Sequence, residues 1–405
     1  MPGRFSAVIS AASLLFAAMP LGAAARGPAE PVAHPPIHAR PFATAAPTGY
    51  MPTQVRHAYG FDQLAQNGAG QVIGIVDAFD DPTAASDLET FITQFGLAQM
   101  NGLSRHTACT IAGGPHPCFQ KVFPQGAKPR TNSGWALEIS LDIQWAHAIA
   151  PGADIALEES RDNRLGNLLG GVTDAATTQG AHAVSMSWGA TDFLGESSFD
   201  GTFNVAGVTF TAASGDGGNG VLWPSSSPFV VAVGGTTLAL DGIGNVLSES
   251  AWSGSGGGIS ANELEPAYQS NYPIPAAANG HRGTPDVSYN ADPNTGVPVF
   301  DTTPLNGQTG WFQVGGTSAG APQWAALIAI TDQARAVGSL SSNNVASSPE
   351  YNAGAPAVYA ANYRDITSGT NGACGAICTA TSGWDFVTGL GSPIANNLVP
   401  FLATH

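Results

Sequence analysis

The chain has 405 residues, a length that suits one or two domains with a large core. Charged residues make up 10% of it, against about a quarter in ordinary soluble proteins, and the formal net charge is −16. Nucleic acid and anionic membranes are therefore not expected as partners, because both bind clustered lysine and arginine. Few salt bridges are possible, which suits a protein that works in acid. Composition alone fits an ordinary secreted acidic protein equally well.

The chain begins like a secretory protein. Arg4 gives a positive start, residues 7–21 are mostly small and apolar, and Ala23–Ala25 offers a cleavage site of the A-x-A kind. These features predict a signal peptide over residues 1–25, which is too short for a membrane span. The mature protein is expected outside the cytoplasm, in the extracellular space or the periplasm.

Residues 26–48 are rich in proline and alanine and predict an extended or disordered segment before one domain over residues 49–405. In that domain short apolar runs alternate with longer stretches of helical character. We expect strands at Gln71–Val76, Asp154–Leu157, Ala183–Met186 and Val208–Ala212, and helices at Pro82–Phe95, Gly134–Ala150, Leu165–Gln179 and Thr317–Ala336. This alternation predicts an α/β fold, a parallel sheet with helices on both faces.

The four cysteines agree with export, because disulfides persist in oxidising compartments. Cys109 lies near Cys118, and Cys374 near Cys378. Four cysteines allow three pairings, and two local disulfides are favoured. Zinc is the alternative, but these spacings make a poor metal pattern, and the one histidine between Cys109 and Cys118, His116, is flanked by prolines that mark a turn.

A serine at a predicted helix start is the first candidate for chemistry. Ser318 follows Gly315–Thr317, where converging backbone N–H groups favour an oxyanion. On this triplet alone a simple helix cap is the better interpretation. A serine hydroxyl also needs a base, usually histidine. Asp77 and His147 are the best candidates for a histidine-based triad, but no histidine opens the helix that should carry the base.

Two acids offer a different base. Glu138 and Asp142 share one face of the predicted helix 134–150, and apolar residues surround most of that helix. Two neighbouring carboxyls cannot both ionise easily, so the pair can share a proton and accept one from a serine in mild acid. For an isolated E-x-x-x-D pattern, exposed surface acids would be the better interpretation.

A third acid, Asp216, follows the strand predicted at Val208–Ala212, at the end of the sheet where α/β sites gather. If buried and protonated, it could donate to an oxyanion. A Gly-Asp surface turn is an equal alternative.

Several segments in a fixed order resemble the sedolisins, the serine-carboxyl peptidases, from about residue 49 to residue 393. They are Glu138–Asp142, Val184–Gly189, Ser214–Asp216, Phe229–Thr236, Gly256–Ser260, Pro285–Pro293, Gly315–Pro322 and Asp365–Gly369. The resemblance implies a subtilisin-like fold with Ser318 as nucleophile, Glu138 as general base, Asp142 as its orienting partner and Asp216 as oxyanion acid.

The resemblance also implies one structural calcium ion near the C-terminus. Its ligands would be Asp365, Ile366, Thr381, Gly383 and Asp385. Thr381 replaces the first glycine of the family's Gly-x-Gly, which changes the backbone freedom there. Without the resemblance, an ordinary Gly/Asp loop is the better interpretation.

These expectations combine into a secreted, monomeric, acid-acting endopeptidase for protein or peptide substrates, although the sequence leaves exopeptidase action open. The alternatives are a histidine-dependent subtilisin-like peptidase and a catalytically silent binding protein on the same scaffold. Sedolisins usually carry a long folded propeptide, whereas only a short Pro/Ala segment precedes Tyr50. Either activity is restrained in another way, or the domain folds without that helper.

Overall fold

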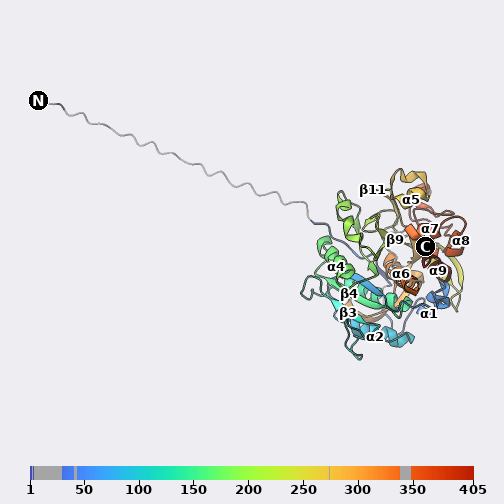
Figure 1. The fold of residues 1–405 in the computed structure, drawn as a ribbon, viewed down its shortest axis with the longest axis horizontal. Helices are drawn as coiled ribbons and strands as arrows, with labels where there is room; N and C mark the ends of the chain where they lie inside the picture. The colour runs from blue at the N-terminus through green and yellow to red at the C-terminus, as the bar shows by residue number, and fades with distance from the viewer. Residues whose placement is uncertain (2, 4–29, 41–42, 273, 338–347) are drawn as a thin grey trace. The chain divides into compact units, whose positions relative to one another are not determined.

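The computed structural model describes residues 1, 3, 30–40, 43–272, 274–337 and 348–405. Apart from residues 1 and 3, the predicted signal peptide lies outside the described residues. Pro31–His405 form one unit, which contains every element considered below (Figure 1). Within the described residues, no helix combines the length and hydrophobicity that a membrane crossing requires.

An eight-stranded sheet forms the centre of this unit, in the order β10-β9-β7-β5-β2-β4-β3, with β13 pairing to β9. The pairs are parallel, except that β10 runs antiparallel to β9. The strands are β2 (Val72–Ala78), β3 (Phe119–Val122), β4 (Asp154–Ser160), β5 (Ala183–Met186), β7 (Thr209–Ala213), β9 (Val230–Leu240), β10 (Val246–Ala251) and β13 (Val287–Asn290). The central strands are buried throughout, as expected for a parallel sheet covered on both faces.

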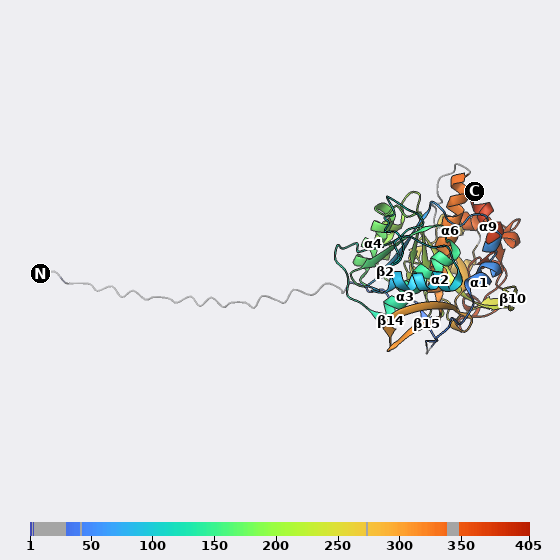
Figure 2. The same cartoon turned by 90° about the horizontal axis from the view of Figure 1, so that it is seen from below.

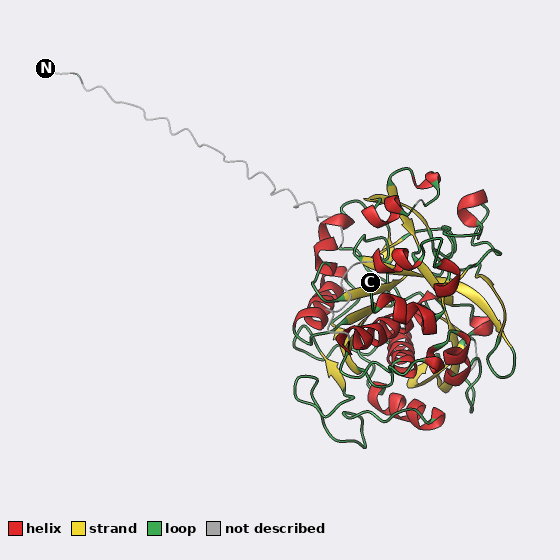
Figure 3. Cartoon of the chain, turned by 45° about the vertical axis from the view of Figure 1, so that its right-hand side comes forward, coloured by secondary structure: helices red, strands yellow, loops and turns green. Residues whose placement is uncertain are grey.

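Strand β2 shows how the two faces are covered. Ile73 and Ile75 belong to the core that contains α3 (Ser133–Ile149) and α6 (Gly320–Val337). Val72 and Val76 belong to a second core with α4 (Leu165–Thr177). Because side chains alternate along a strand, these helices cover opposite faces of the sheet, and Figure 3 shows red helices against the yellow strands. Asp77 is two residues after Ile75 on the same strand, so its side chain points to the same face as Ile73 and Ile75, toward α3.

A hairpin outside the main sheet supports α3. Strands β14 (Val297–Leu305) and β15 (Gln308–Gly315) pair antiparallel, and β14 packs on α3 (Figure 2). Helix α2 (Ala84–Phe95) packs on α3 and on β14. Other elements are β1 (His38–Ala39), α1 (Pro52–Ala58), β6 (Ala190–Thr191), η2 (Glu196–Phe203), β8 (Leu222–Trp223), β11 (Gly258–Leu264), α5 (Ala267–Asn271), β12 (His281–Thr284), η5 (Thr317–Ala319), α7 (Ser348–Ala353), α8 (Tyr359–Asn362), β16 (Tyr363–Arg364), β17 (Ser392–Pro393) and α9 (Ala395–Leu402).

The predicted elements exist, with small shifts at their ends. The strand at Ala183–Met186 is confirmed, and both local disulfides form, Cys109–Cys118 and Cys374–Cys378. Strand β3 was missed, because it lies in a loop-rich stretch and is only partly buried. An extended or disordered segment was expected over residues 26–48, and Pro31–Ala39 is extended and hydrogen-bonded to the domain. The hydrogen-bond partners of its backbone are distant in sequence, so the Pro and Ala content of the segment cannot predict them.

Candidate active site

Helix α3 carries the acid pair into the core. The side chain of Asn132 caps its start by accepting hydrogen bonds from the N–H groups of Gly134 and Trp135, at 3.0 and 3.2 Å. The sequence is apolar on nearly every face, so the helix is buried from Trp135 to Ile149. Glu138 and Asp142 are both 0% exposed, which removes the surface-acid interpretation of the pair.

Ser318 lies in the short helix η5, directly before α6, and is also 0% exposed. The residue before this helix, Gly316, has a φ of 111°. A Cβ there would collide with the carbonyl oxygen of Pro36 and lie 2.5 Å from Oδ2 of Asp216. Only glycine fits, and the space it leaves is bounded by the serine helix and Asp216.

The structure brings Ser318 and the acid pair together. Helix α3 packs against η5. Burial raises the pKa of Glu138 well above its usual value, with Asp142 and Asp77 as further causes, while the hydroxyl of Ser318 lowers this pKa. Burial likewise raises the pKa of Asp142, which Ser187 and Glu138 lower as hydrogen-bonding partners. Neighbouring buried carboxyls of this kind hold protons in common at mildly acid pH.

These contacts are close without being fully formed. Among the described residues, the side-chain oxygens of Glu138, Asp142 and Ser318 have no partner that meets both the distance and the angle of a hydrogen bond. The three side chains therefore lie close enough to influence the pKa values of Glu138 and Asp142, but their geometry is looser than that of a formed hydrogen bond. Catalytic hydrogen bonds commonly tighten only when substrate binds.

Asp216 lies next to the serine helix and contacts its first residue, Thr317. Its Oδ1 accepts hydrogen bonds from the N–H and the hydroxyl of Thr317, both at 2.8 Å. Burial raises the pKa of Asp216 to about 7, although the two hydrogen bonds from Thr317 lower it. At acid pH its carboxyl is therefore protonated, and its Oδ2 has no hydrogen-bond partner among the described residues. A neutral carboxyl can donate a hydrogen bond to a nearby oxyanion.

The histidine-based alternative loses its base. His147 lies nine positions after Glu138 on α3, about 14 Å farther along the axis. Its Nε2 lies 2.8 Å from the carbonyl oxygen of Ala98, and burial lowers its pKa to about 4. Asp77 is buried next to Asp142, whose charge adds to burial in raising its pKa. Asp77 therefore extends the acid pair rather than orienting an imidazole.

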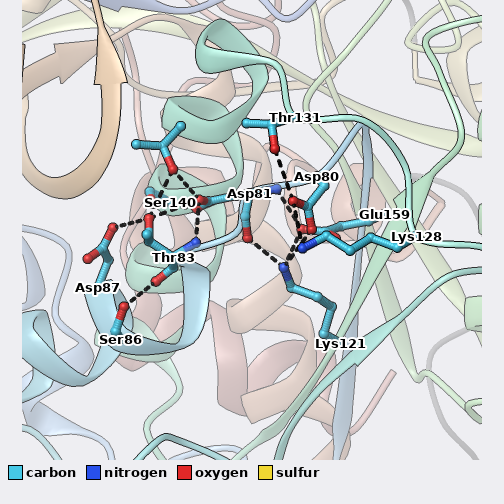
Figure 4. Close-up of polar contacts among 11 residues, drawn as sticks. Asp80, Asp81, Thr83, Ser86, Asp87, Lys121, Lys128, Thr131, Ser140 and Glu159 are labelled. Carbon is cyan, nitrogen blue, oxygen red and sulfur yellow. Dashed lines mark hydrogen bonds and ion pairs between the residues drawn. The ribbon is translucent and has the colours of Figure 1, made fainter. Parts of the chain in front are cut away.

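Sequence reasoning missed a polar network that fixes α3 in place (Figure 4). Ser140, between the two acids, donates to Oδ2 of Asp81 at 3.2 Å. Lys121 of β3 lies 2.9 Å from Glu159 of β4 and 3.3 Å from Asp80. The network joins α3 to the carboxyl ends of β2 and β4 and limits rotation of the helix. The signal was present, since Asp80 and Asp81 follow the first predicted strand.

The residues predicted to hold calcium lie around one loop. Ser382 donates to Oδ2 of Asp365 at 2.9 Å, and the N–H of Gly383 lies 3.1 Å from both oxygens of that carboxyl. The N–H of Thr381 donates to Oδ2 of Asp385 at 2.9 Å. Two carboxylates with neighbouring backbone carbonyls are a donor set that suits Ca²⁺. The described residues contain no group of three or more His, Cys, Asp or Glu placed to hold a metal, so backbone oxygens would have to complete the site.

Comparison of the sequence with known proteins points to a family of peptidases. The Subtilase family profile (Peptidase S8) matches residues 105–364, more than half of the chain. The chain belongs to the subtilase family. Among the similar proteins, kumamolisin of Bacillus sp. (strain MN-32) is 32% identical over 89% of this chain and 64% of its own length. Sedolisin of Pseudomonas sp. (strain 101) is 27% identical over 87% of the chain and 61% of its own length.

A solved structure points to the same group. Pseudomonas sedolisin, a serine-carboxyl proteinase complexed with two molecules of pseudo-iodotyrostatin, aligns with a TM-score of 0.71 and 26% identity, covering 89% of this chain and 99% of that one. The chain is therefore a sedolisin-family member with a subtilisin-like α/β fold in a single domain. It spans about six tenths of the length of the curated relatives it matches.

Proposed function

We propose that this protein is a secreted serine-carboxyl endopeptidase that hydrolyses peptide bonds in acid. The observation that carries the proposal is the burial of Ser318 against Glu138 and Asp142, with no histidine hydrogen-bonded to the serine hydroxyl among the described residues. A single proton shared by the acid pair leaves one carboxylate to act as base. The family membership supports peptide substrates.

Each residue has a separate role in the proposed reaction. Glu138 takes the proton of the Ser318 hydroxyl as its oxygen attacks the substrate carbonyl, and then delivers that proton to the leaving amine. Asp142 orients Glu138 and holds the single proton that the pair shares. Protonated Asp216 and the N–H of Ser318 donate to the oxyanion. Water then attacks the acyl carbonyl while Glu138 takes a proton from it, and Glu138 delivers that proton to the Ser318 oxygen as the acyl group leaves.

Calcium has a structural role in the proposal. Asp365 and Asp385, with the backbone carbonyls of Ile366, Thr381 and Gly383, would hold one Ca²⁺ that ties the segment after α8 to the loop at residues 381–385. The mixture of carboxylate and carbonyl oxygens supports this ion. The Cys374–Cys378 disulfide lies in the same part of the chain and would support the loop.

Export and a monomeric state complete the proposal. The two disulfides are compatible with an oxidising compartment outside the cytoplasm. The direct test is incubation of the purified protein and its Ser318→Ala variant with a denatured protein at about pH 4, near an ordinary carboxyl pKa. Cleavage by the wild type alone is expected. Folded wild type without any cleavage would instead favour the silent binding protein.

A further inference from the structure

Positive charges gather around one hollow beside the central sheet. The chain has 13 lysines and arginines in all. Four of them line a cavity of about 510 Å³, which we call the basic hollow: Lys128, Arg130, Arg161 and Arg164. Lys121 adds a fifth cation nearby, because it and Lys128 both reach the carboxyl of Asp80, at 3.3 and 3.2 Å (Figure 4). Like charges repel at close range, so this gathering is costly unless an anion offsets it.

The hollow itself offers little negative charge. Among the described residues, its lining contains a single acid, Asp162, which lies 3.0 Å from Arg164. Burial tends to raise the pKa values of Asp162 and Asp80, but hydrogen bonds and the neighbouring cations lower both, so both carboxyls stay ionised in mild acid. Burial raises the pKa of Glu159 to about 8, although Lys121 lies 2.9 Å away. This third carboxyl is therefore neutral in acid, and an excess of positive charge remains.

The chemistry of the lining fits a phosphate group. Guanidinium groups bind phosphate oxygens through paired N–H donors, and three of the four cations are arginines. Arg130 is placed by the ring of Phe79, whose centroid lies 5.2 Å from the guanidinium carbon. At about pH 4 the carboxyl groups of a peptide are close to half protonated, whereas a phosphate monoester keeps one negative charge because its second pKa is about 6. In acid the hollow therefore distinguishes phosphate from carboxylate.

The basic hollow lies at one end of a route that passes the candidate active site. The N–H of Ser318 points to the carbonyl oxygen of Pro36 at 3.4 Å. Val32, four residues earlier in the same extended stretch, pairs antiparallel with Arg164 on the wall of the hollow. Four extended residues span about 13 Å. An extended peptide with its carbonyl at Ser318 can therefore reach the hollow with residues on the amino side of the attacked bond.

We propose that the basic hollow binds a phosphate group carried by the peptide substrate, four to six residues before the residue whose carbonyl is attacked. The preferred substrates are peptides with phosphoserine or phosphothreonine at that distance. The inference rests on the proposed function, because it names the substrate class of the same site.

Two other occupants fit the observations less well. A nucleic acid needs cations along several phosphates, whereas one hollow offers four cations on a chain with a net charge of −16. Free inorganic phosphate shares the chemistry of the ligand, but it does not account for a hollow whose wall, at Arg164, pairs with an extended stretch that leads to the serine. The experiments below separate these sources of phosphate.

The first test compares two peptides that differ only in serine or phosphoserine, five residues before the bond that the full-length wild type cleaves at about pH 4. The phosphopeptide should show a kcat/KM about tenfold higher, mainly through KM, because two or three exposed charge pairs each contribute a few-fold. In the double variant Arg161→Gln, Arg164→Gln this ratio should fall to about one. Arg105→Gln is the matched control, because this arginine is 87% exposed and lies outside the lining of the hollow, and it should keep the ratio. A wild-type ratio of one, or a tenfold ratio retained by the double variant, would overturn the proposal.

The second test does not depend on hydrolysis. Binding of both peptides to Ser318→Ala, with and without Arg161→Gln and Arg164→Gln, is measured by fluorescence anisotropy. A Kd about tenfold lower for the phosphopeptide, lost in the triple variant, supports the site even if the wild type cleaves neither peptide, in which case the proposed function alone fails. Equal Kd values for the two peptides, together with hydrolysis by the wild type, would overturn the phosphate site and leave the proposed function standing. Inorganic phosphate that competes at the Kd of the phosphopeptide, or a single-stranded oligonucleotide that binds more tightly than it, would overturn the assignment to a peptide.

Discussion

Replacing Asp216 with Asn separates the proposed oxyanion acid from every other titrating group at the site. Asn keeps Oδ1, which accepts two hydrogen bonds from Thr317, and it still offers N–H groups in place of the carboxyl proton. It has no proton to lose as pH rises. In the wild type, burial raises the pKa of Asp216 to about 7, so the protonated form is present below this pH and is lost above it.

The size of the effect follows from that pKa. About 0.1% of the Asp216 carboxyl is ionised at pH 4 and about 90% at pH 8, so the wild-type rate should fall about tenfold for each pH unit above 7. The Asn variant should be about 10- to 100-fold slower at pH 4, because an amide is a weaker donor than a carboxylic acid. The same decline above pH 7 should be absent from it.

The assay is the initial rate of hydrolysis of a denatured protein between pH 3 and 9, measured for both forms. Circular dichroism at each pH confirms that both stay folded. An Asn variant that still declines about tenfold per unit from pH 7 would show that another group controls this limb, and the role assigned to Asp216 would be wrong.

Three further predictions concern stability. Ser140→Ala removes a buried hydrogen bond to Asp81 and should lower the free energy of unfolding in urea by about 1–2 kcal/mol; an unchanged value would mean that the network of Figure 4 does not stabilise α3. Excess EDTA should lower the Tm of the wild type but not that of Asp385→Ala, and equal responses of the two proteins would argue against calcium at this loop. Burial raises the pKa of Glu158 to about 9 from 4.5, with Asp174 adding to it. The folded-state pKa is the higher one, so this group contributes stability below about pH 4.5 that is lost as pH rises through about 9. The Tm of Glu158→Gln should therefore fall less between pH 5 and 8 than the Tm of the wild type. An equal fall in the two proteins would refute the raised pKa of Glu158.

The buried helix that carries the acid pair could be predicted from sequence because its signal is local. Apolar residues surround Glu138 and Asp142 on nearly every face, so the helix had to be buried and its acids needed a partner. The structure supplies that partner in Ser318, 180 positions later in the chain. Only the order of motifs, and not any local pattern, could connect the two.

Contacts set by tertiary structure could not be predicted in the same way. Pro31–Ala39 has the composition of a disordered segment, but its backbone hydrogen bonds go to Asn163, Gly189 and β15. Nothing in the segment itself identifies those partners. Strand β3 was missed for a related reason, because its pairing with β4 and the charges around Lys121 depend on neighbours distant in sequence.

The hydrolysis rate of Glu138→Gln at pH 4 tests the central claim most directly, with His147→Gln as the matched control on the same helix. An amide cannot accept the serine proton, so the rate should fall by at least about a thousandfold, while His147→Gln, if folded, keeps most of its activity. Near-normal hydrolysis by Glu138→Gln, together with loss of activity in a folded His147→Gln protein, would contradict a carboxyl base and restore the imidazole.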